Sequence, residues 1–226
     1  SVYIADAQAK VDSIVDWVGT HTDAARDLSQ RGLVPMPLQS NGYNFKGQSG
    51  RLNSRKPKTE DYSIAGALGV YTGVNANNIL CLDVDDPATL PREIRRHIAE
   101  SDGLFCWSTN EGKDALTVEE VKSALIEGKP GGKSKVLYVS QYKSNLPGKV
   151  RFKSHSGTYG KRRLFAGALE IFYGEKVNVL GTSLRKNQRR FYSISEGKPC
   201  ALPGALVEIV SEQFEPRSIK ERVEHV

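Results

Sequence analysis

Two aspartates at the end of a short apolar run are the first residues whose types and spacing suggest chemistry. Asp83 and Asp85 follow the apolar residues 79–82, and Pro87 prevents a regular strand from continuing. Because side chains alternate faces along a strand, both aspartates point the same way. Their mutual repulsion is relieved by Mg²⁺ or Mn²⁺, which take oxygen ligands and leave positions for substrate phosphates. The alternative is a solvated turn in which Asp86 caps a following helix.

A third acid, Glu170, interrupts the apolar run of residues 166–174. Burying a lone carboxylate is costly unless it is paired or binds a metal. On a strand beside Asp83 and Asp85, Glu170 would complete a two-metal cluster. The alternative is an edge strand from which Glu170 points outward.

Basic residues follow in two adjoining segments. Residues 150–155 alternate apolar and polar side chains and predict a strand whose exposed face ends in His155. The next segment, 156–163, is punctuated by glycines, and its amides and cations could cradle a triphosphate. An exposed hairpin is the alternative. The cations at the end of this segment are Lys161, Arg162 and Arg163.

The charge balance favours a polyanionic partner. Lys and Arg number 32 against 26 Asp and Glu, a net charge of +6, and the excess is clustered in several segments. Phosphates would supply affinity for such clusters, although a merely basic surface is the alternative. Neither a signal-peptide pattern nor an apolar run of roughly 20 residues is present, which predicts a cytoplasmic protein. The three cysteines, predicted as buried thiols of a reducing compartment, are Cys81, Cys106 and Cys200.

Hydrophobic periodicity predicts helices alternating with short strands. The length of 226 residues suits one main domain. Residues 39–63 predict a long loop, and the charged tail from residue 215 predicts a linker. Helices are expected within 1–30 and at 91–100, 117–127 and 205–214, and strands at 33–38, 68–73, 79–84, 103–108, 136–139, 150–155, 166–174, 177–181 and 190–194.

The order of these motifs resembles the primase/polymerase (prim-pol) family of the archaeo-eukaryotic primase superfamily, found in plasmid and phage replication proteins. The resemblance spans roughly residues 10–200. The motifs that carry it are Gly-Leu-Val-Pro-Met-Pro-Leu, a Lys-Pro loop, Gly-Val-Tyr-Thr-Gly, Leu-Asp-Val-Asp-Asp, Leu-Glu-Ile-Phe-Tyr-Gly and Val-Leu-Gly-Thr-Ser.

The resemblance implies an α+β fold with a mixed or antiparallel central sheet, an RRM-like catalytic core flanked by helices, and a smaller basic lobe or insertion. It implies a catalytic domain over 1–206, with an insertion at about 109–149. Residues 207–226 would hold a C-terminal helix and the start of a linker to a further region, commonly a helicase. Family members sometimes carry a zinc stem, for which this chain lacks the cysteines.

The same resemblance assigns roles to residues. Asp83 and Asp85 match the first acidic motif and Glu170 the third, together holding two Mg²⁺ or Mn²⁺ ions. The middle motif, Ser-x-His, contacts nucleotide phosphates, and here Ser154 and His155 stand with no residue between them. His155 is the residue expected to act there. The other residues expected to hold the triphosphate are Ser154, Lys153, Lys161, Arg162 and Arg163.

The implied activity is template-dependent nucleotidyl transfer, as DNA primase and DNA polymerase. Its partners would be single-stranded or primed template DNA and nucleoside triphosphates. One rival is a metal-dependent nuclease. The common restriction-type nuclease pattern has a lysine two residues after the strand glutamate, however, and here that residue is Phe172. Another is a non-catalytic DNA-binding replication domain whose acids only cap turns.

Overall fold

The structure, a computed structural model, describes residues 20–48, 65–73, 75–140, 151–152, 161–185, 187–211 and 214–215. Within these ranges the chain has an α+β fold built on one large sheet, which confirms the predicted class. None of the helices in the described ranges has the length and apolar character needed to span a bilayer.

The large sheet contains ten strands in the described part of the chain, in the order β1-β2-β9-β10-β4-β5-β3-β8-β7, with β11 beside β5. Neighbours on this path are antiparallel, whereas β11 runs parallel to β5. Strands β6 and β12 form a separate pair. The strands are β1 (Pro35–Leu38), β2 (Ala67–Val70), β3 (Ile79–Val84), β4 (Leu104–Asn110), β5 (Ser134–Val139), β6 (Arg151–Phe152), β7 (Lys161–Leu164), β8 (Leu169–Phe172), β9 (Val177–Arg185), β10 (Gln188–Ile194), β11 (Cys200–Ala201) and β12 (Phe214–Glu215).

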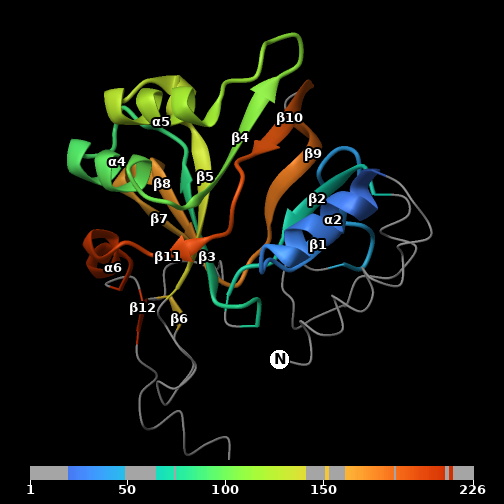
Figure 1. The fold of residues 1–226 in the computed structure, drawn as a ribbon, viewed down its shortest axis with the longest axis horizontal. Coiled ribbons are helices and arrows are strands. Elements are labelled where there is room, and N and C mark those ends of the chain that lie inside the picture. Colours follow the sequence, from blue (N-terminus) through green and yellow to red (C-terminus); the bar gives the residue numbers. More distant parts are fainter. Residues whose placement is uncertain are drawn as a thin grey trace, which may run out of the picture.

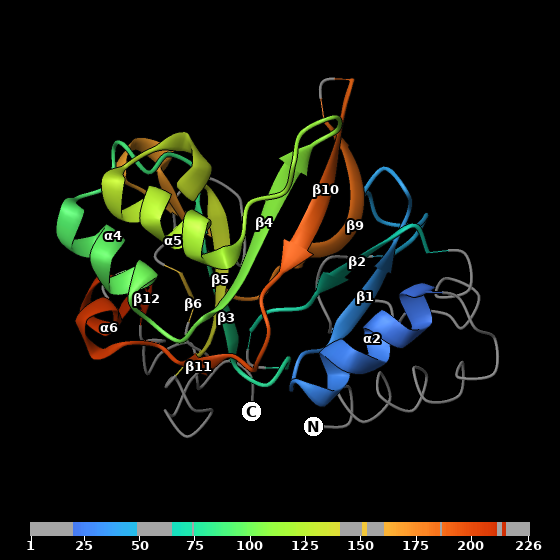
Figure 2. The same cartoon turned by 45° about the horizontal axis from the view of Figure 1, so that its top comes forward.

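The helices cover different parts of the sheet. Three of them gather beside β3, β5, β7 and β8, while one lies on β1 and β2 (Figure 1, Figure 2). The acid-bearing strands therefore have a helical layer on one face. The first three helices named are α4 (Arg92–Ala99), α5 (Val118–Glu127) and α6 (Gly204–Ser211), and the last is α2 (Thr20–Gln30).

Strand β3 is buried along its whole length. Leu80, Leu82 and Val84 pack in the cluster that includes α4, α5 and α6. Ile79 and Cys81 pack in a second cluster, on the α2 side. Burial on both faces explains why the strand reads as an unbroken apolar run. Since Asp83 shares the face of Ile79 and Cys81, it lies on the side opposite α4, α5 and α6.

Local signals set the helix boundaries near the site. Thr117 accepts a hydrogen bond from the Glu120 amide, and the Glu120 carboxylate accepts one from the Thr117 amide, so a capping box starts α5. Helix α4 begins at Arg92, after Pro91, and not at residue 87. Asp86 instead accepts hydrogen bonds from Ala88 and Thr89 and closes a turn.

Several segments differ from the sequence expectation. Residues 161–164, predicted as part of a loop, form edge strand β7 beside β8. Strands β9 and β10 extend into a long hairpin, turned at Asn187 with φ of 61°. Strand β5 begins at Ser134, before the strand predicted at 136–139, and pairs with both β3 and β4.

Candidate metal centre and adjoining cleft

The three acids predicted to act together meet on one face of the sheet. Asp83 and Glu170 are direct cross-strand partners on β3 and β8. Asp85 follows the end of β3 and points to the same side. One carboxylate oxygen from each of the three residues lies within 4.8 Å of the others. Sheet register therefore brings together residues that are far apart in the sequence.

The backbone after β3 fixes the position of Asp85. The amides of Asp85 and Asp86 both donate to the Ala168 carbonyl, at 2.9 and 3.2 Å. This contact ties the end of β3 to the turn before β8. The Asp86 side chain is turned into its own loop, where hydrogen bonds, above all that from the Thr89 hydroxyl, hold the pKa of Asp86 below its ordinary value. Asp86 is thus outside the cluster.

Two cations flank the acids in the same row. Arg163 on β7 is the cross-strand partner of Glu170, and its Nε donates to Glu170 Oε1 at 2.6 Å. On the other side, Lys135 on β5 is the partner of Asp83, with Nζ 3.5 Å from Asp83 Oδ2. Four neighbouring strands therefore present one row of side chains in the order cation, acid, acid, cation.

The inner members of this row are shielded from water and the outer arginine is not. Asp83 and Glu170 are 8% and 5% exposed. The Arg163 side chain is 70% exposed, whereas that of Lys135 is 20% exposed. The exposed Arg163 pairing contributes little stability by itself, and Arg163 is free to exchange partners.

Lys135 keeps its charge despite its position. Burial is the largest effect and acts to lower the pKa of Lys135, but the Asp83 carboxylate, together with Tyr192, Cys106 and Cys81, holds that pKa above its ordinary value. The Lys135 ammonium also lies over the ring of Tyr192, 5.4 Å from its centroid. A protonated lysine therefore stands beside the acids at neutral pH.

The buried thiols nearby do not add ligands. Burial raises the pKa of Cys106 to about 12, with Lys135 opposing and Asp83 reinforcing the shift. Burial likewise raises the pKa of Cys81 well above its ordinary value. Only thiolates bind metal ions well, so both thiols are poor ligands near neutral pH. The donor set is three carboxylates, which suits hard cations such as Mg²⁺ and Mn²⁺.

A cleft of about 300 Å³ opens on this face, between the acids and the strands β9 and β10. One wall is the loop of residues 39–48, where the Gly42 carbonyl accepts hydrogen bonds from Lys176 and Asn178 at 3.3 and 3.1 Å. Gly42 has φ of +80°, and a Cβ there would lie 2.8 Å from Asn178. The wall is therefore closely fitted to β9. The polar side chains lining the cleft include Asp83, Asp85, Glu170, Ser108, Lys135, Lys176, Ser183, Arg190 and Tyr192.

The remaining residues predicted at the site differ in whether the structure describes them and in where they lie. Arg163 joins the acids, but as a partner of Glu170. The backbone of Lys161 and Arg162 lies on β7, and their side chains are outside the described part of the chain. The remaining three predicted residues, Lys153, Ser154 and His155, lie wholly outside the described residues.

Lys135 is a residue of the site that is not predicted from the sequence, where it counts with Lys129 and Lys133 as one basic cluster. A signal existed, because Lys135 shares an alternating face with Leu137 while Val136 and Tyr138 occupy the opposite face. A single cation on a buried strand needs a nearby acid. Its partner, however, depends on strand register, which the local sequence does not specify.

Comparisons of the chain with protein-family models, curated proteins and solved structures found no match.

Proposed function

We propose that this chain is a metal-dependent nucleotidyl transferase, and that Asp83, Asp85 and Glu170 hold its divalent cations. The observation that carries the proposal is the convergence of three carboxylate oxygens within 4.8 Å of one another. Oxygen donors of this kind suit Mg²⁺ or Mn²⁺, which bind through carboxylates and retain positions for phosphate oxygens. The adjoining cleft gives a phosphorylated substrate room beside the acids.

When bound, divalent cations would lower the pKa of an attacking 3′-hydroxyl and neutralise charge on the triphosphate and leaving pyrophosphate. The chain's own residues then have distinct tasks. The three acids position the reacting groups. Lys135 supplies a fixed positive charge on the cleft side of Asp83. Exposed Arg163 can pass from Glu170 to a substrate phosphate, because guanidinium groups bind both oxyanions in the same way.

DNA primase and DNA polymerase activity, in the replication of a plasmid, phage or other mobile element, is the form of this chemistry that we propose. The prim-pol resemblance and the basic clusters support it, as does the occurrence of the first and third acidic motifs on paired strands. A primase-like core, template DNA and nucleoside triphosphates as partners, and a C-terminal helicase or accessory region belong to the same proposal. Base pairing to the template would supply most of the sequence specificity.

The test is incubation with a primed template, deoxynucleotides and Mn²⁺, followed by separation of the products by length. Extension supports the proposal, and wild-type turnover by Asp83→Asn or Glu170→Gln would remove these acids from the site. Asp86→Asn is the matched control because Asp86 is a neighbouring aspartate that faces its own turn. That variant should extend primers at the wild-type rate.

A metal-dependent nuclease is the second candidate, and one observation favours it. The lysine absent at position 172 has a spatial counterpart, since Lys135 Nζ is 3.5 Å from Asp83. Such a lysine could orient an attacking water in hydrolysis. Incubation with DNA and Mn²⁺ but without nucleotides separates the two functions, because degradation that requires Lys135 would indicate the nuclease.

A further inference from the structure

We propose that Arg190 on β10 binds a backbone phosphate of the nucleic-acid strand, and so sets the path by which that strand leaves the acids. This inference rests on the proposed function and adds a strand-binding residue to it. Arg190 lines the cleft together with Asp83, Asp85 and Glu170. Arg190 follows Arg189 on β10, and strand alternation sends these two arginines to opposite faces.

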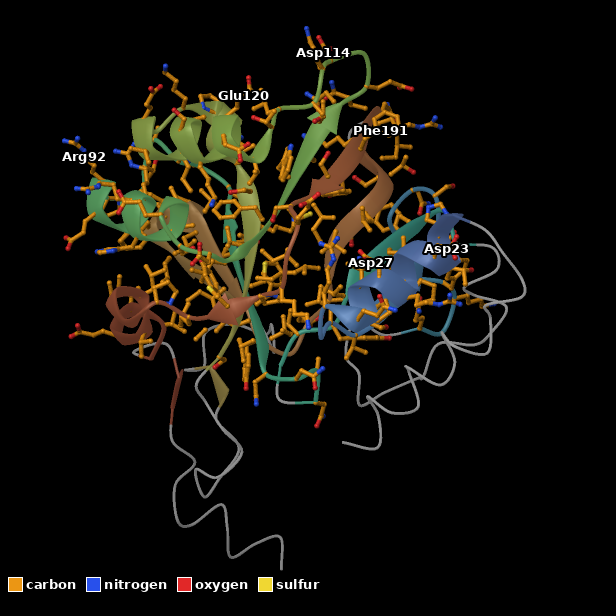
Figure 3. The ribbon with its side chains drawn as sticks, in the orientation of Figure 1. Asp23, Asp27, Arg92, Asp114, Glu120 and Phe191 are labelled. Atoms are coloured by element: carbon orange, nitrogen blue, oxygen red, sulfur yellow. The ribbon has the colours of Figure 1, made fainter. Side chains whose placement is uncertain are left out.

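The two arginines at the start of β10 have opposite surroundings. Arg190 pairs with Ser183 across the hairpin and faces the cleft. Arg189 pairs with Leu184 and faces the other side, where its Nη1 lies 3.9 Å from Glu111 Oε1. Phe191 shares that outer face, near the outer end of β10 (Figure 3), and is 43% exposed. Arg190 is therefore the member of this pair directed at substrate.

Arg190 has an unmet hydrogen-bonding requirement. Its Nε is buried and has no hydrogen-bond partner among the residues that the structure describes. A buried donor left without a partner is destabilising, and a ligand oxygen that enters the cleft would supply the missing acceptor. A guanidinium donor in a cleft suits a phosphate oxygen, which accepts charge-assisted hydrogen bonds.

Neighbouring groups add donors of the right kind. Tyr192 lies two residues along the same face as Arg190, and its hydroxyl is 3.5 Å from Ser183 Oγ. Ser183 is in turn the cross-strand partner of Arg190. One cation and two hydroxyl groups thus meet on one patch of the cleft. This combination recognises a phosphodiester without reading bases.

The position of this patch favours a strand over a free triphosphate. Ile194 lies in the same cross-strand row as Cys106, Lys135 and Asp83. Arg190 precedes Ile194 by four residues, which places its backbone about 13 Å along the strands from that row. Lys135 already supplies a cation next to the acids. Arg190 would therefore contact a phosphate several nucleotides from the reacting end, since successive phosphates on one strand of a duplex are spaced about 3.4 Å apart along the helix axis.

The test measures binding of a fluorescent single-stranded oligonucleotide to the full chain in EDTA, at several salt concentrations. EDTA removes the metal chemistry from the readout. Arg190→Gln should weaken binding about tenfold or more, and the slope of log affinity against log salt should fall by about 0.7 for the lost contact. Arg189→Gln is the matched control, because it removes the same charge from the opposite face, and it should bind within about twofold of wild type.

Equal losses in both variants would overturn the proposal, because they would indicate unspecific attraction. So would unchanged oligonucleotide binding by Arg190→Gln, including the case in which only its KM for nucleoside triphosphate rises. If Arg190→Gln lowers the unfolding temperature, Arg190→Lys decides: it keeps the charge and should keep the wild-type salt slope, so a slope as low as that of Arg190→Gln would overturn the proposal. If oligonucleotide binding depends on Arg190 but the wild-type chain extends no primer, the proposed polymerase activity is refuted and the strand-binding role of Arg190 is retained.

Discussion

Asp83 on β3 and Glu170 on β8 are direct cross-strand partners, and each is also the partner of a cation on its outer side. Two buried carboxylates side by side repel each other, so the flanking Lys135 and Arg163 offset part of that repulsion. The two cations differ in exposure. Lys135 is held within the cleft, whereas Arg163 lies mostly in solvent and can be displaced.

Arg163→Gln should tighten Mn²⁺ binding, because the Arg163 guanidinium competes with the metal for the Glu170 carboxylate. Only the Arg163 side of this pair is exposed, so the gain in affinity should be at least about fivefold, which corresponds to the upper value of about 1 kcal/mol for a fully exposed ion pair. Calorimetric titration at low ionic strength measures it. Arg189→Gln controls for the change in net charge, and equal Mn²⁺ affinities in all three proteins would show that Arg163 does not compete.

The stability of the chain should fall as pH rises above about 8.5, the ordinary pKa of a thiol. The folded state keeps the Cys106 thiol protonated because burial raises its pKa to about 12. The unfolded state loses this proton at lower pH, so fewer protons are bound in the unfolded state and alkali favours unfolding. The contribution approaches about 1.4 kcal/mol per pH unit between these two values. Urea unfolding between pH 8 and 10 measures the slope.

Cys106→Ala isolates this contribution. The variant should be less stable at every pH because it leaves a small cavity, but its stability should fall less steeply above pH 8.5. Parallel slopes for the two proteins would mean that the Cys106 thiol is not responsible.

Gly42→Ala should disturb the cleft wall. Gly42 has φ of +80°, and an added Cβ would lie 2.8 Å from both Asn178 Nδ2 and Ser183 Cβ. Gly47→Ala is a matched control, since Gly47 has φ of +77° but nothing within 4 Å of the added Cβ. Both variants carry the backbone cost of about 1 kcal/mol, and Gly42→Ala should lose at least about 1 kcal/mol more. Equal free energies of unfolding in urea would refute the close fit of the loop to β9.

The acidic part of the site could be predicted because its signals are local. An apolar run that ends in D-x-D fixes the face of Asp83 and Asp85, and a lone Glu170 in a buried strand requires a partner. The roles of the cations could not be predicted in the same way. Lys135 and Arg163 acquire their partners from the pairing of β5 with β3 and of β7 with β8, which depends on contacts distant in the chain.

The boundaries of helices and strands likewise could be predicted where local sequence signals set them, and not where strand pairing sets them. The helix predicted at residues 117–127 agrees with α5, whose ends are set by the local capping box and by Gly128. Strand β7 was predicted as a loop because its basic residues give no apolar alternation, and pairing with β8 makes it a strand. The start of α4 agrees with the helix predicted at residues 91–100, and Asp86, which has the side chain of a helix cap, closes an isolated turn instead.

The most direct test of the proposed metal centre is a calorimetric titration of the wild-type chain with Mn²⁺, beside Asp83→Asn, Glu170→Gln and the control Asp86→Asn. The expected result is that wild type and Asp86→Asn bind Mn²⁺ alike, and that loss of either cluster acid weakens binding at least about tenfold. Wild-type affinity in Glu170→Gln, or no binding by the wild-type chain, would contradict it.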